Sequence, residues 1–170
     1  MKPLRCVISG SVCSGKTTTI NELEKEFKVF HDNARVLIKN YFGDSTKIDR
    51  DFLERKLIEI HKKDFNEAEG ICFFDQGLID CLAFYLMDSL DVPSDLLEEA
   101  KKFKYDYIFF LENPDFYEND EIRKENIGQR EKLGEAMIKL YFDLGYNVIK
   151  VPFMSVIERI KFIKKHLKLT

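Results

Sequence analysis

The eight residues from Gly10 to Thr17, GSVCSGKT, constrain the fold more than any other part of the chain. They fit the spacing G-x-x-x-x-G-K-[ST], and they lie between an apolar segment, Leu4 to Ser9, and a segment with helical periodicity, Lys16 to Phe27. The glycines permit backbone conformations in which consecutive N–H groups face one anion, and the start of a helix adds its own unpaired N–H groups. This stretch therefore predicts a phosphate-binding loop between a strand and a helix.

The loop also predicts a nucleotide and a metal ion as ligands. The residues expected to surround the phosphates of ATP are Gly10, Ser11, Val12, Cys13, Ser14, Gly15, Lys16, Thr17 and Thr18. The Lys16 ammonium should reach the β- and γ-phosphates, and the Thr17 hydroxyl should bind Mg²⁺. The side chain of Cys13 is expected to point away from the phosphates. ATP and Mg²⁺ are therefore the predicted cofactors.

Apolar strand-like segments alternate with helical segments along the whole chain, without an internal repeat or a linker. Strands are expected at residues 4–9, 28–31, 70–74, 105–111 and 146–151. Helices are expected at residues 16–27, 33–41, 49–65, 78–89, 94–103, 122–144 (with interruptions near Gly128 or Gly134) and 155–167. Ser94 is a predicted N-cap, and Ser155 and Glu158 have the spacing of a capping box. The pattern predicts one α/β domain over residues 1–170, with a parallel sheet covered by helices on both faces.

Carboxylates follow three of the predicted strands, where the functional groups of parallel sheets gather. The rule selects Asp32, Asp75 and Glu112 in addition to the phosphate loop. Asp75 is expected to hold Mg²⁺ through water or to accept a proton from the attacking group, and Asp32 to face an acceptor hydroxyl. The alternative is that each aspartate caps the helix that follows it. Arg35 either binds a substrate phosphate or pairs with Asp32.

Two arginines follow the fourth predicted strand. They come after a polar segment at residues 113–120, NPDFYEND, which is expected to be a loop. Phosphoryl transfer often needs an arginine to neutralise charge on the transferring group, and Arg123 and Arg130 share one face of a helix if that helix is continuous. The alternative is a solvated helix face, on which Glu125 and Glu131 balance the two arginines at little gain in stability.

Composition argues against several classes of partner. The 27 basic and 30 acidic residues give a net charge of −3, which provides no bulk attraction for nucleic acid or an anionic membrane. The chain has no run of 18 apolar residues, and its N-terminal segment reaches the glycine loop too early for a signal peptide, so a cytoplasmic location is expected.

The cysteines lack the spacing of a metal site, and Cys6 and Cys72 are expected to be buried free thiols. The 15 phenylalanines leave room for an interface between copies of the chain.

In their order along the chain, these motifs resemble the small AAA-type P-loop ATPase and kinase-like domains, a family that includes the nicotinamide-riboside-kinase-like proteins. The segments that carry the resemblance are GSVCSGKTT near the start, DNAR at 32–35, FFDQGLIDCLAF at 73–84, YDYIFFL at 105–111, DEIR at 120–123 with Arg130, and LGYNVIKVPFMSVIERIKFI at 144–163. The resemblance covers nearly the whole chain. After the phosphate loop, its most distinctive part is the GY-x-V-I-x-V-P stretch, followed by a helix with an internal E-R pair.

The resemblance implies a three-layer P-loop fold whose five-stranded parallel sheet has the order 2-3-1-4-5. It also implies an ATP site at residues 10–18, an acceptor site near Asp32 and Asp75, and a lid over about residues 112–130 that carries the two arginines. The family usually has Asp-Arg-Gly where this chain has Asp75-Gln76-Gly77, and more often has glutamate at the position of Asp32. The missing arginine counts against an acceptor that carries a phosphate, and against kinase activity itself.

The function predicted from the sequence is ATP- and Mg²⁺-dependent phosphoryl transfer to a small hydroxyl acceptor such as a nucleoside or nucleotide. The predicted catalytic residues are Lys16, Asp32, Asp75, Arg123 and Arg130, and the predicted metal ligands are Thr17 and Asp75. The alternative is a nucleotide-dependent switch or slow ATPase that acts with a macromolecular partner. A guanine-specific GTPase is disfavoured because the chain contains no N-K-x-D, and a polynucleotide-end kinase because of the acidic net charge.

Overall fold

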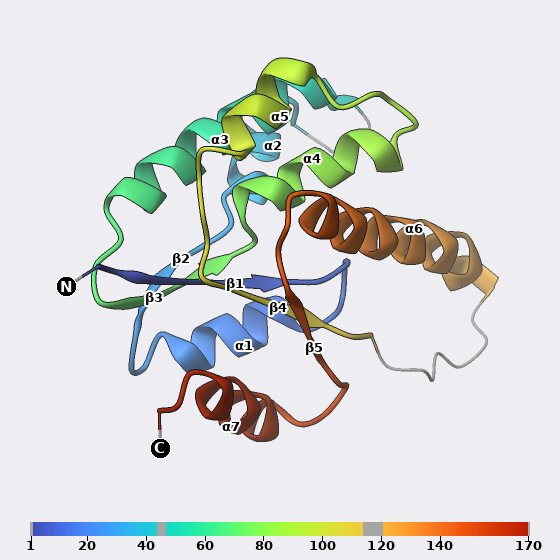
Figure 1. The fold of residues 1–170 in the computed structure, drawn as a ribbon. Helices are drawn as coiled ribbons and strands as arrows, with labels where there is room; N and C mark the ends of the chain where they lie inside the picture. Colours follow the sequence, from blue (N-terminus) through green and yellow to red (C-terminus); the bar gives the residue numbers. More distant parts are fainter. Residues whose placement is uncertain (1, 44–46, 114–120, 170) are drawn as a thin grey trace.

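Five parallel strands form the central sheet of the computed structural model, which describes residues 2–43, 47–113 and 121–169, with only the backbone for residues 121–127 (Figure 1). The strands are β1 (Leu4–Ser9), β2 (Lys28–Phe30), β3 (Ile71–Asp75), β4 (Tyr107–Leu111) and β5 (Val148–Val151). Their order across the sheet is β2-β3-β1-β4-β5, which places the first strand of the sequence in the middle. The predicted parallel sheet and its strand order are confirmed.

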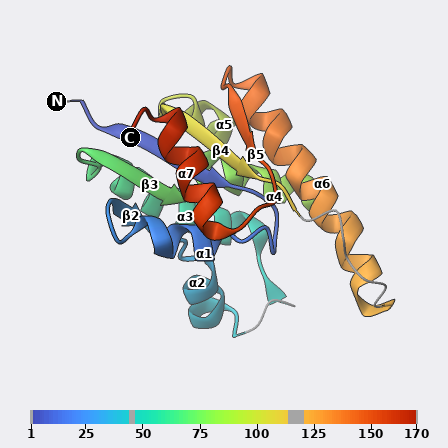
Figure 2. The same ribbon diagram turned by 90° about the horizontal axis from the view of Figure 1, so that it is seen from below.

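Helices cover both faces of this sheet and complete the predicted three layers (Figure 1). One face is covered by α1 (Lys16–Leu23) and α7 (Val156–His166), which lie in front of the sheet in Figure 2. The opposite face is covered by α2 (Ala34–Tyr41), α3 (Arg50–Asn66), α4 (Leu78–Met87), α5 (Ser94–Ala100) and α6 (Glu121–Asp143). None of the helices within the described ranges is long and apolar enough to cross a membrane.

The three central strands, β3, β1 and β4, are buried on both sides because their alternate side chains enter two separate hydrophobic clusters. In β1, Cys6 and Ile8 lie in the cluster shared with α1 and α7, whereas Val7 lies in the cluster shared with α4 and α6. Cys6 and Cys72 are fully buried free thiols, as predicted. This two-sided burial explains why the strands read as continuous apolar runs in the sequence.

The helix α6 is continuous from Glu121 to Asp143, so the predicted interruptions near Gly128 and Gly134 are wrong. A glycine inside a helix costs about 1 kcal/mol relative to alanine, which the packing of a long helix can offset. Gly134 also serves the packing, since a Cβ there would lie 3.3 Å from the Phe110 ring and 3.8 Å from Cβ of Ser11. The missing side chain therefore lets α6 lie close to β4 and to the phosphate loop. Residues 114–120 of the loop predicted before α6 lie outside the described residues.

Two predicted helix caps have different outcomes. Ser155 and Glu158 form the predicted capping box at the start of α7, where the Ser155 backbone N–H donates to Glu158 Oε2 at 3.0 Å. Ser94, in contrast, is the first residue of α5, and Pro93 occupies the N-cap position without a side-chain hydrogen bond. The prediction for Ser94 is therefore wrong by one position, because the backbone turns into the helix one residue earlier than the serine suggests.

A tightly packed glycine joins α4 to the sheet and to α6. Gly77 is the N-cap of α4. A Cβ at this position would lie 3.0 Å from Tyr141 Oη, 3.1 Å from Val7 Cγ2 and 3.3 Å from Tyr105 Cε2. All three neighbours are buried, so they have little room to move away.

We expect Gly77→Ala to lower the free energy of unfolding by about 1–3 kcal/mol, because the added methyl group overpacks this junction. Urea denaturation followed by far-UV circular dichroism measures the change. Gly128→Ala is the matched control, since a Cβ there meets no atom within 4 Å and should stabilise α6 by up to about 1 kcal/mol. Equal effects of the two substitutions would contradict the packing argument.

Candidate active site

The phosphate loop connects β1 to α1 and has the backbone that its glycines predict. Gly10 and Gly15 have φ angles of 144° and 87°, and the non-glycine Cys13 has a φ angle of 65°. A Cβ on Gly10 would lie 2.7 Å from Ser14 Oγ and 2.9 Å from the Leu111 carbonyl oxygen. Glycine is therefore required at position 10 for both its backbone angle and its close contact with the end of β4.

Lys16 lies at the centre of this loop. Its Nζ donates hydrogen bonds to the carbonyl oxygens of Gly10 at 2.7 Å and Ser11 at 2.8 Å. Burial lowers the pKa of Lys16, while the negative charges of Asp75, Asp80 and Asp32 act in the opposite direction. A cation held in a partly buried loop attracts phosphate more strongly than an exposed lysine does.

A cavity of about 410 Å³, which we call the β3-side cavity, brings together four of the predicted catalytic and metal-binding residues. It is lined by Lys16 and Thr17 from the phosphate loop and α1, by Asp32 after β2, and by Asp75 at the end of β3. Its wall also includes Arg35, Gln76, Phe84 and several loop residues. Two carboxylates thus share one cavity with the lysine and the hydroxyl of the loop.

Asp75 is almost completely buried, with 6% of its surface exposed. Burial, reinforced by the negative charge of Asp32, raises the pKa of Asp75 from 3.8 to about 6, although Lys16 opposes the shift. Gly77, not Asp75, is the N-cap of α4, so the alternative structural role of Asp75 at that helix is wrong.

Asp32 combines a structural contact with its place in the cavity. Its Oδ1 accepts a hydrogen bond from the Ala34 backbone N–H at 2.9 Å, at the start of α2. Burial raises the pKa of Asp32, and the bond from Ala34 and the charge of Lys16 oppose this shift. Arg35 is exposed, and within the described residues it forms no ion pair with Asp32. Arg35 lines the β3-side cavity together with Asp32.

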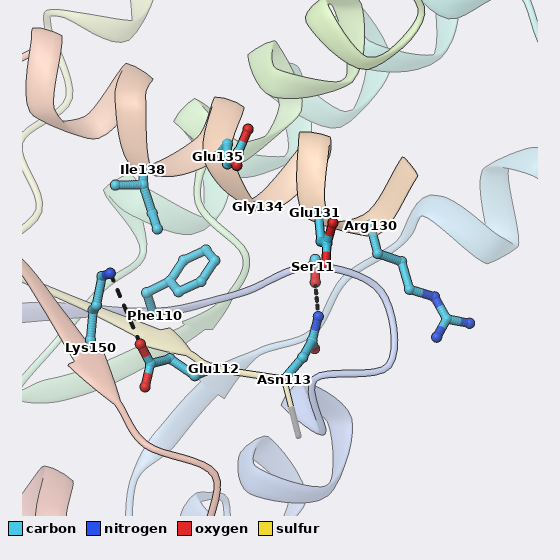
Figure 3. Close-up of a pocket in the computed structure, with 10 residues that line it drawn as sticks. All are labelled: Ser11, Phe110, Glu112, Asn113, Arg130, Glu131, Gly134, Glu135, Ile138 and Lys150. Carbon is cyan, nitrogen blue, oxygen red and sulfur yellow. Dashed lines mark hydrogen bonds and ion pairs between the residues drawn. The ribbon is translucent and has the colours of Figure 1, made fainter. Parts of the chain in front are cut away.

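A second cavity of about 330 Å³, the β4-side cavity, lies between α6 and the ends of β4 and β5 (Figure 3). Arg130 lines this cavity, not the one that holds Asp32 and Asp75. In Figure 3 its guanidinium extends from α6 away from Glu112 and Lys150. The continuous α6 places Arg123 seven residues earlier on the same helix, but the side chain of Arg123 lies outside the described residues.

Asn113 and Asp80 are site residues that the sequence analysis missed. Asn113 Nδ2 donates to Ser11 Oγ at 2.7 Å, which ties the chain after β4 to the phosphate loop (Figure 3). The fully buried Asp80 accepts from Ser9 Oγ at 2.6 Å, from the Gly77 N–H at 2.7 Å and from Tyr141 Oη at 2.9 Å. The sequence signal for Asp80 was its place in the motif FFDQGLIDCLAF, which also contains Gly77, whereas Ser9 and Tyr141 come from distant segments.

Comparisons with known proteins agree with this geometry. Residues 5–159 match the model of a protein family described as "AAA domain". An uncharacterized protein of Borreliella burgdorferi is 25% identical over an alignment of 156 residues that covers 87% of this chain. The chain spans only 31% of the length of that curated relative.

Three solved structures share the fold. Deoxyadenosine kinase from M. mycoides has a TM-score of 0.66 and 16% identity, with 98% of this chain and 100% of that chain covered. Thymidylate kinase from Ehrlichia chaffeensis has a TM-score of 0.69 and 10% identity, with 96% and 98% covered. The NadR protein in complex with NAD and AMP-PNP has a TM-score of 0.68 and 16% identity, with 99% and 50% covered. At these identities the similarity establishes a P-loop kinase fold.

The raised pKa of Asp75 predicts a pH-dependent effect of Asp75→Asn. Between about pH 4 and pH 6 the folded protein binds more protons at Asp75 than the unfolded chain does, so this residue lowers stability as the pH rises through that range, by up to about 3 kcal/mol. We therefore expect the variant to be more stable than the wild type at pH 7.5, with a smaller difference at pH 4.

Urea denaturation at the two pH values measures this difference. Asp91→Asn, which removes an exposed carboxylate between α4 and α5, is measured at the same two pH values as the control for a substitution at the surface. An Asp75→Asn protein that is less stable than the wild type at pH 7.5 would contradict the argument.

Proposed function

The chain belongs to the AAA domain family, and from this premise we propose that it is an ATP- and Mg²⁺-dependent phosphotransferase acting on a small hydroxyl compound. The observation that carries the proposal is the β3-side cavity, which the phosphate loop shares with the buried carboxylate of Asp75 and the half-buried carboxylate of Asp32. A site that transfers a phosphoryl group needs space and a proton acceptor for a second substrate beside the loop. Two of the solved structures that share the fold are named as kinases of nucleosides or nucleotides, which supports the same class here.

The donor phosphates would bind to the backbone N–H groups of residues 10–18. Lys16 is placed to contact the β- and γ-phosphates once its ammonium leaves the carbonyl oxygens of Gly10 and Ser11. Arg123 and Arg130 are proposed to neutralise charge on the transferring group from α6, within a lid of about residues 112–130. The NadR structure, which contains AMP-PNP, supports ATP as the donor.

The residues of the cavity fit a magnesium ion. Mg²⁺ prefers oxygen ligands and is often held by one or two protein oxygens together with substrate phosphates and water. The Thr17 hydroxyl and the Asp75 carboxylate are such ligands, and both line the β3-side cavity. When bound there, the ion would neutralise part of the phosphate charge.

Either carboxylate could take the proton of the acceptor hydroxyl. With a pKa of about 6, Asp75 is ionised at pH 7.5 and is more basic than an exposed aspartate, which suits a general base. Asp32 lines the same cavity after the neighbouring strand. Because Asp75 is also a proposed magnesium ligand, Asp32→Asn is the variant that distinguishes the two assignments: it should abolish transfer only if Asp32 is the base.

The charge balance of the cavity favours an uncharged acceptor such as a nucleoside. Its described lining includes two cations, Lys16 and Arg35, and two carboxylates, Asp32 and Asp75. Because Lys16 is assigned to the donor phosphates, Arg35 is left facing two negative charges. Gln76, which also lines the wall, adds no positive charge for an acceptor phosphate.

A nucleotide-dependent switch is the second candidate, and one observation favours it. The chain spans 31% of the Borreliella protein, so that protein joins this kind of domain to other segments on which a nucleotide-driven change could act. This candidate predicts slow hydrolysis that no small acceptor stimulates.

The experiment that tests the proposal is ADP release from Mg-ATP, with and without separate pools of nucleosides, nucleotides and nicotinamide riboside. We expect one pool to stimulate ADP release and to yield a phosphorylated product by mass spectrometry. Lys16→Ala should lower the stimulated rate by about a hundredfold or more, because it removes a positive charge from the transferring phosphates.

Lys25→Ala is the matched control, since Lys25 is exposed just beyond α1 and its removal should leave the rate unchanged. A slow rate that no pool changes and that Lys16→Ala abolishes would contradict the transferase proposal and support the switch.

A further inference from the structure

The E-R pair of the last helix, Glu158-Arg159, is a distinctive motif that the proposed reaction does not use. Glu158 is explained by the capping box at the start of α7. Arg159 is different, because it is only 3% exposed and its guanidinium lies at the base of the phosphate loop. Within the described residues it forms no ion pair with a carboxylate, and burial lowers its pKa. The cost of burying such a cation calls for an explanation.

The hydrogen bonds of Arg159 are with the loop and the first turn of α1, and its guanidinium also lies over the Phe153 ring, 5.6 Å from the ring centroid. Its Nη1 donates to the Ser14 carbonyl oxygen at 2.9 Å and to Thr19 Oγ1 at 3.5 Å. Thr19 Oγ1 in turn donates to the Gly15 carbonyl oxygen at 2.9 Å. The Ser14 carbonyl is therefore held directly from α7, and the Gly15 carbonyl is held by Thr19 of α1, which Arg159 contacts in turn. The helices α7 and α1 pack side by side below the sheet (Figure 1).

Gly15 is the residue that admits this guanidinium. A Cβ at position 15 would lie 2.5 Å from Arg159 Nη1, closer than real Cβ atoms approach other atoms. The φ angle of 87° at Gly15 also favours glycine. The second glycine of the phosphate-binding motif thus serves a contact with the far end of the chain as well as a backbone turn.

The geometry of the peptide bond links this contact to ligand binding. In a planar trans peptide the C=O and the N–H point in opposite directions. Because Arg159 holds the Ser14 oxygen on the α7 side, the N–H of Gly15 must point to the opposite side of the loop.

We propose that Arg159 is a positioning residue that fixes the Ser14–Gly15 peptide so that the Gly15 N–H donates to a nucleotide phosphate. The proposal rests on the nucleotide site of the proposed function, but not on phosphoryl transfer. The buried positive charge behind the loop also favours an anion in front of it. If Arg159 contributed only to the stability of the fold, its removal would leave the affinity of the folded protein for phosphate unchanged.

The test measures ADP binding by the full chain without an acceptor. Isothermal titration calorimetry compares the wild type with Arg159→Met, which keeps an apolar stem of similar length, and with Arg159→Lys, which keeps the charge but loses the planar donor pair. We expect Arg159→Met to weaken ADP binding by about ten- to hundredfold, the range for a hydrogen bond to a charged group, and Arg159→Lys to recover part of the loss. Lys165→Met, an exposed change on the same helix, should bind ADP as the wild type does.

A second readout follows the Gly15 N–H itself. In ¹⁵N-glycine-labelled protein, addition of ADP should shift the Gly15 amide resonance of the wild type and of Lys165→Met, and shift it less in Arg159→Met. If Arg159→Met does not fold, the same comparison with Arg159→Lys decides the matter. The proposal would be overturned if folded Arg159→Met bound ADP within twofold of the wild type. It would also be overturned if ADP shifted the Gly15 amide resonance of Arg159→Met as much as that of the wild type.

These measurements separate the two proposals. A wild type that binds ADP in an Arg159-dependent way but phosphorylates no acceptor would uphold the role of Arg159 and refute the transferase. A wild type that phosphorylates an acceptor, but whose ADP affinity does not change when Arg159 is replaced, would support the transferase and refute the role of Arg159. A wild type that binds no ADP would refute the nucleotide site and the role of Arg159 with it.

Discussion

The hydrogen bonds to the buried carboxylate of Asp80 fix how α4 and α6 are placed relative to β1 and the phosphate loop. The carboxylate accepts hydrogen bonds from Ser9 at the end of β1, from Gly77 at the start of α4 and from Tyr141 in α6. A buried carboxylate is tolerated only when donors satisfy its oxygens, so the three segments must meet at one point. Because Ser9 directly precedes the phosphate loop, the position of the loop relative to α4 and α6 follows from this network.

The sheet could be predicted from the sequence because two-sided burial leaves a local signal. Strands such as β4 are apolar throughout, and each is followed by a segment with helical periodicity. The continuity of α6 could not be predicted, since Gly134 is required by the Phe110 ring and by Ser11, which are far away in the chain. The low helix propensity of glycine predicts a break in the helix at such a position, whereas tertiary packing keeps the helix continuous.

The site was predictable to the extent that it is built from strand ends. Asp32 and Asp75 reach one cavity with Lys16 and Thr17 because β2, β3 and β1 are neighbours in a parallel sheet. Arg130 reaches a different cavity because α6 lies beyond β1, over β4. Asp80, Asn113 and Arg159 were missed because each has a partner 61 to 145 residues away, and such contacts cannot be recognised from spacing along the chain.

The contact between Arg159 and Ser14 joins residues 145 positions apart. It has a consequence for the order in which the protein is made. During synthesis the loop leaves the ribosome early, and β1, α1 and β3 can assemble before the last helix exists. The loop acquires its final support only when α7 has been translated and has docked beside α1. Under this arrangement, a nascent or C-terminally truncated chain contains every residue of the glycine motif and still lacks the finished binding loop.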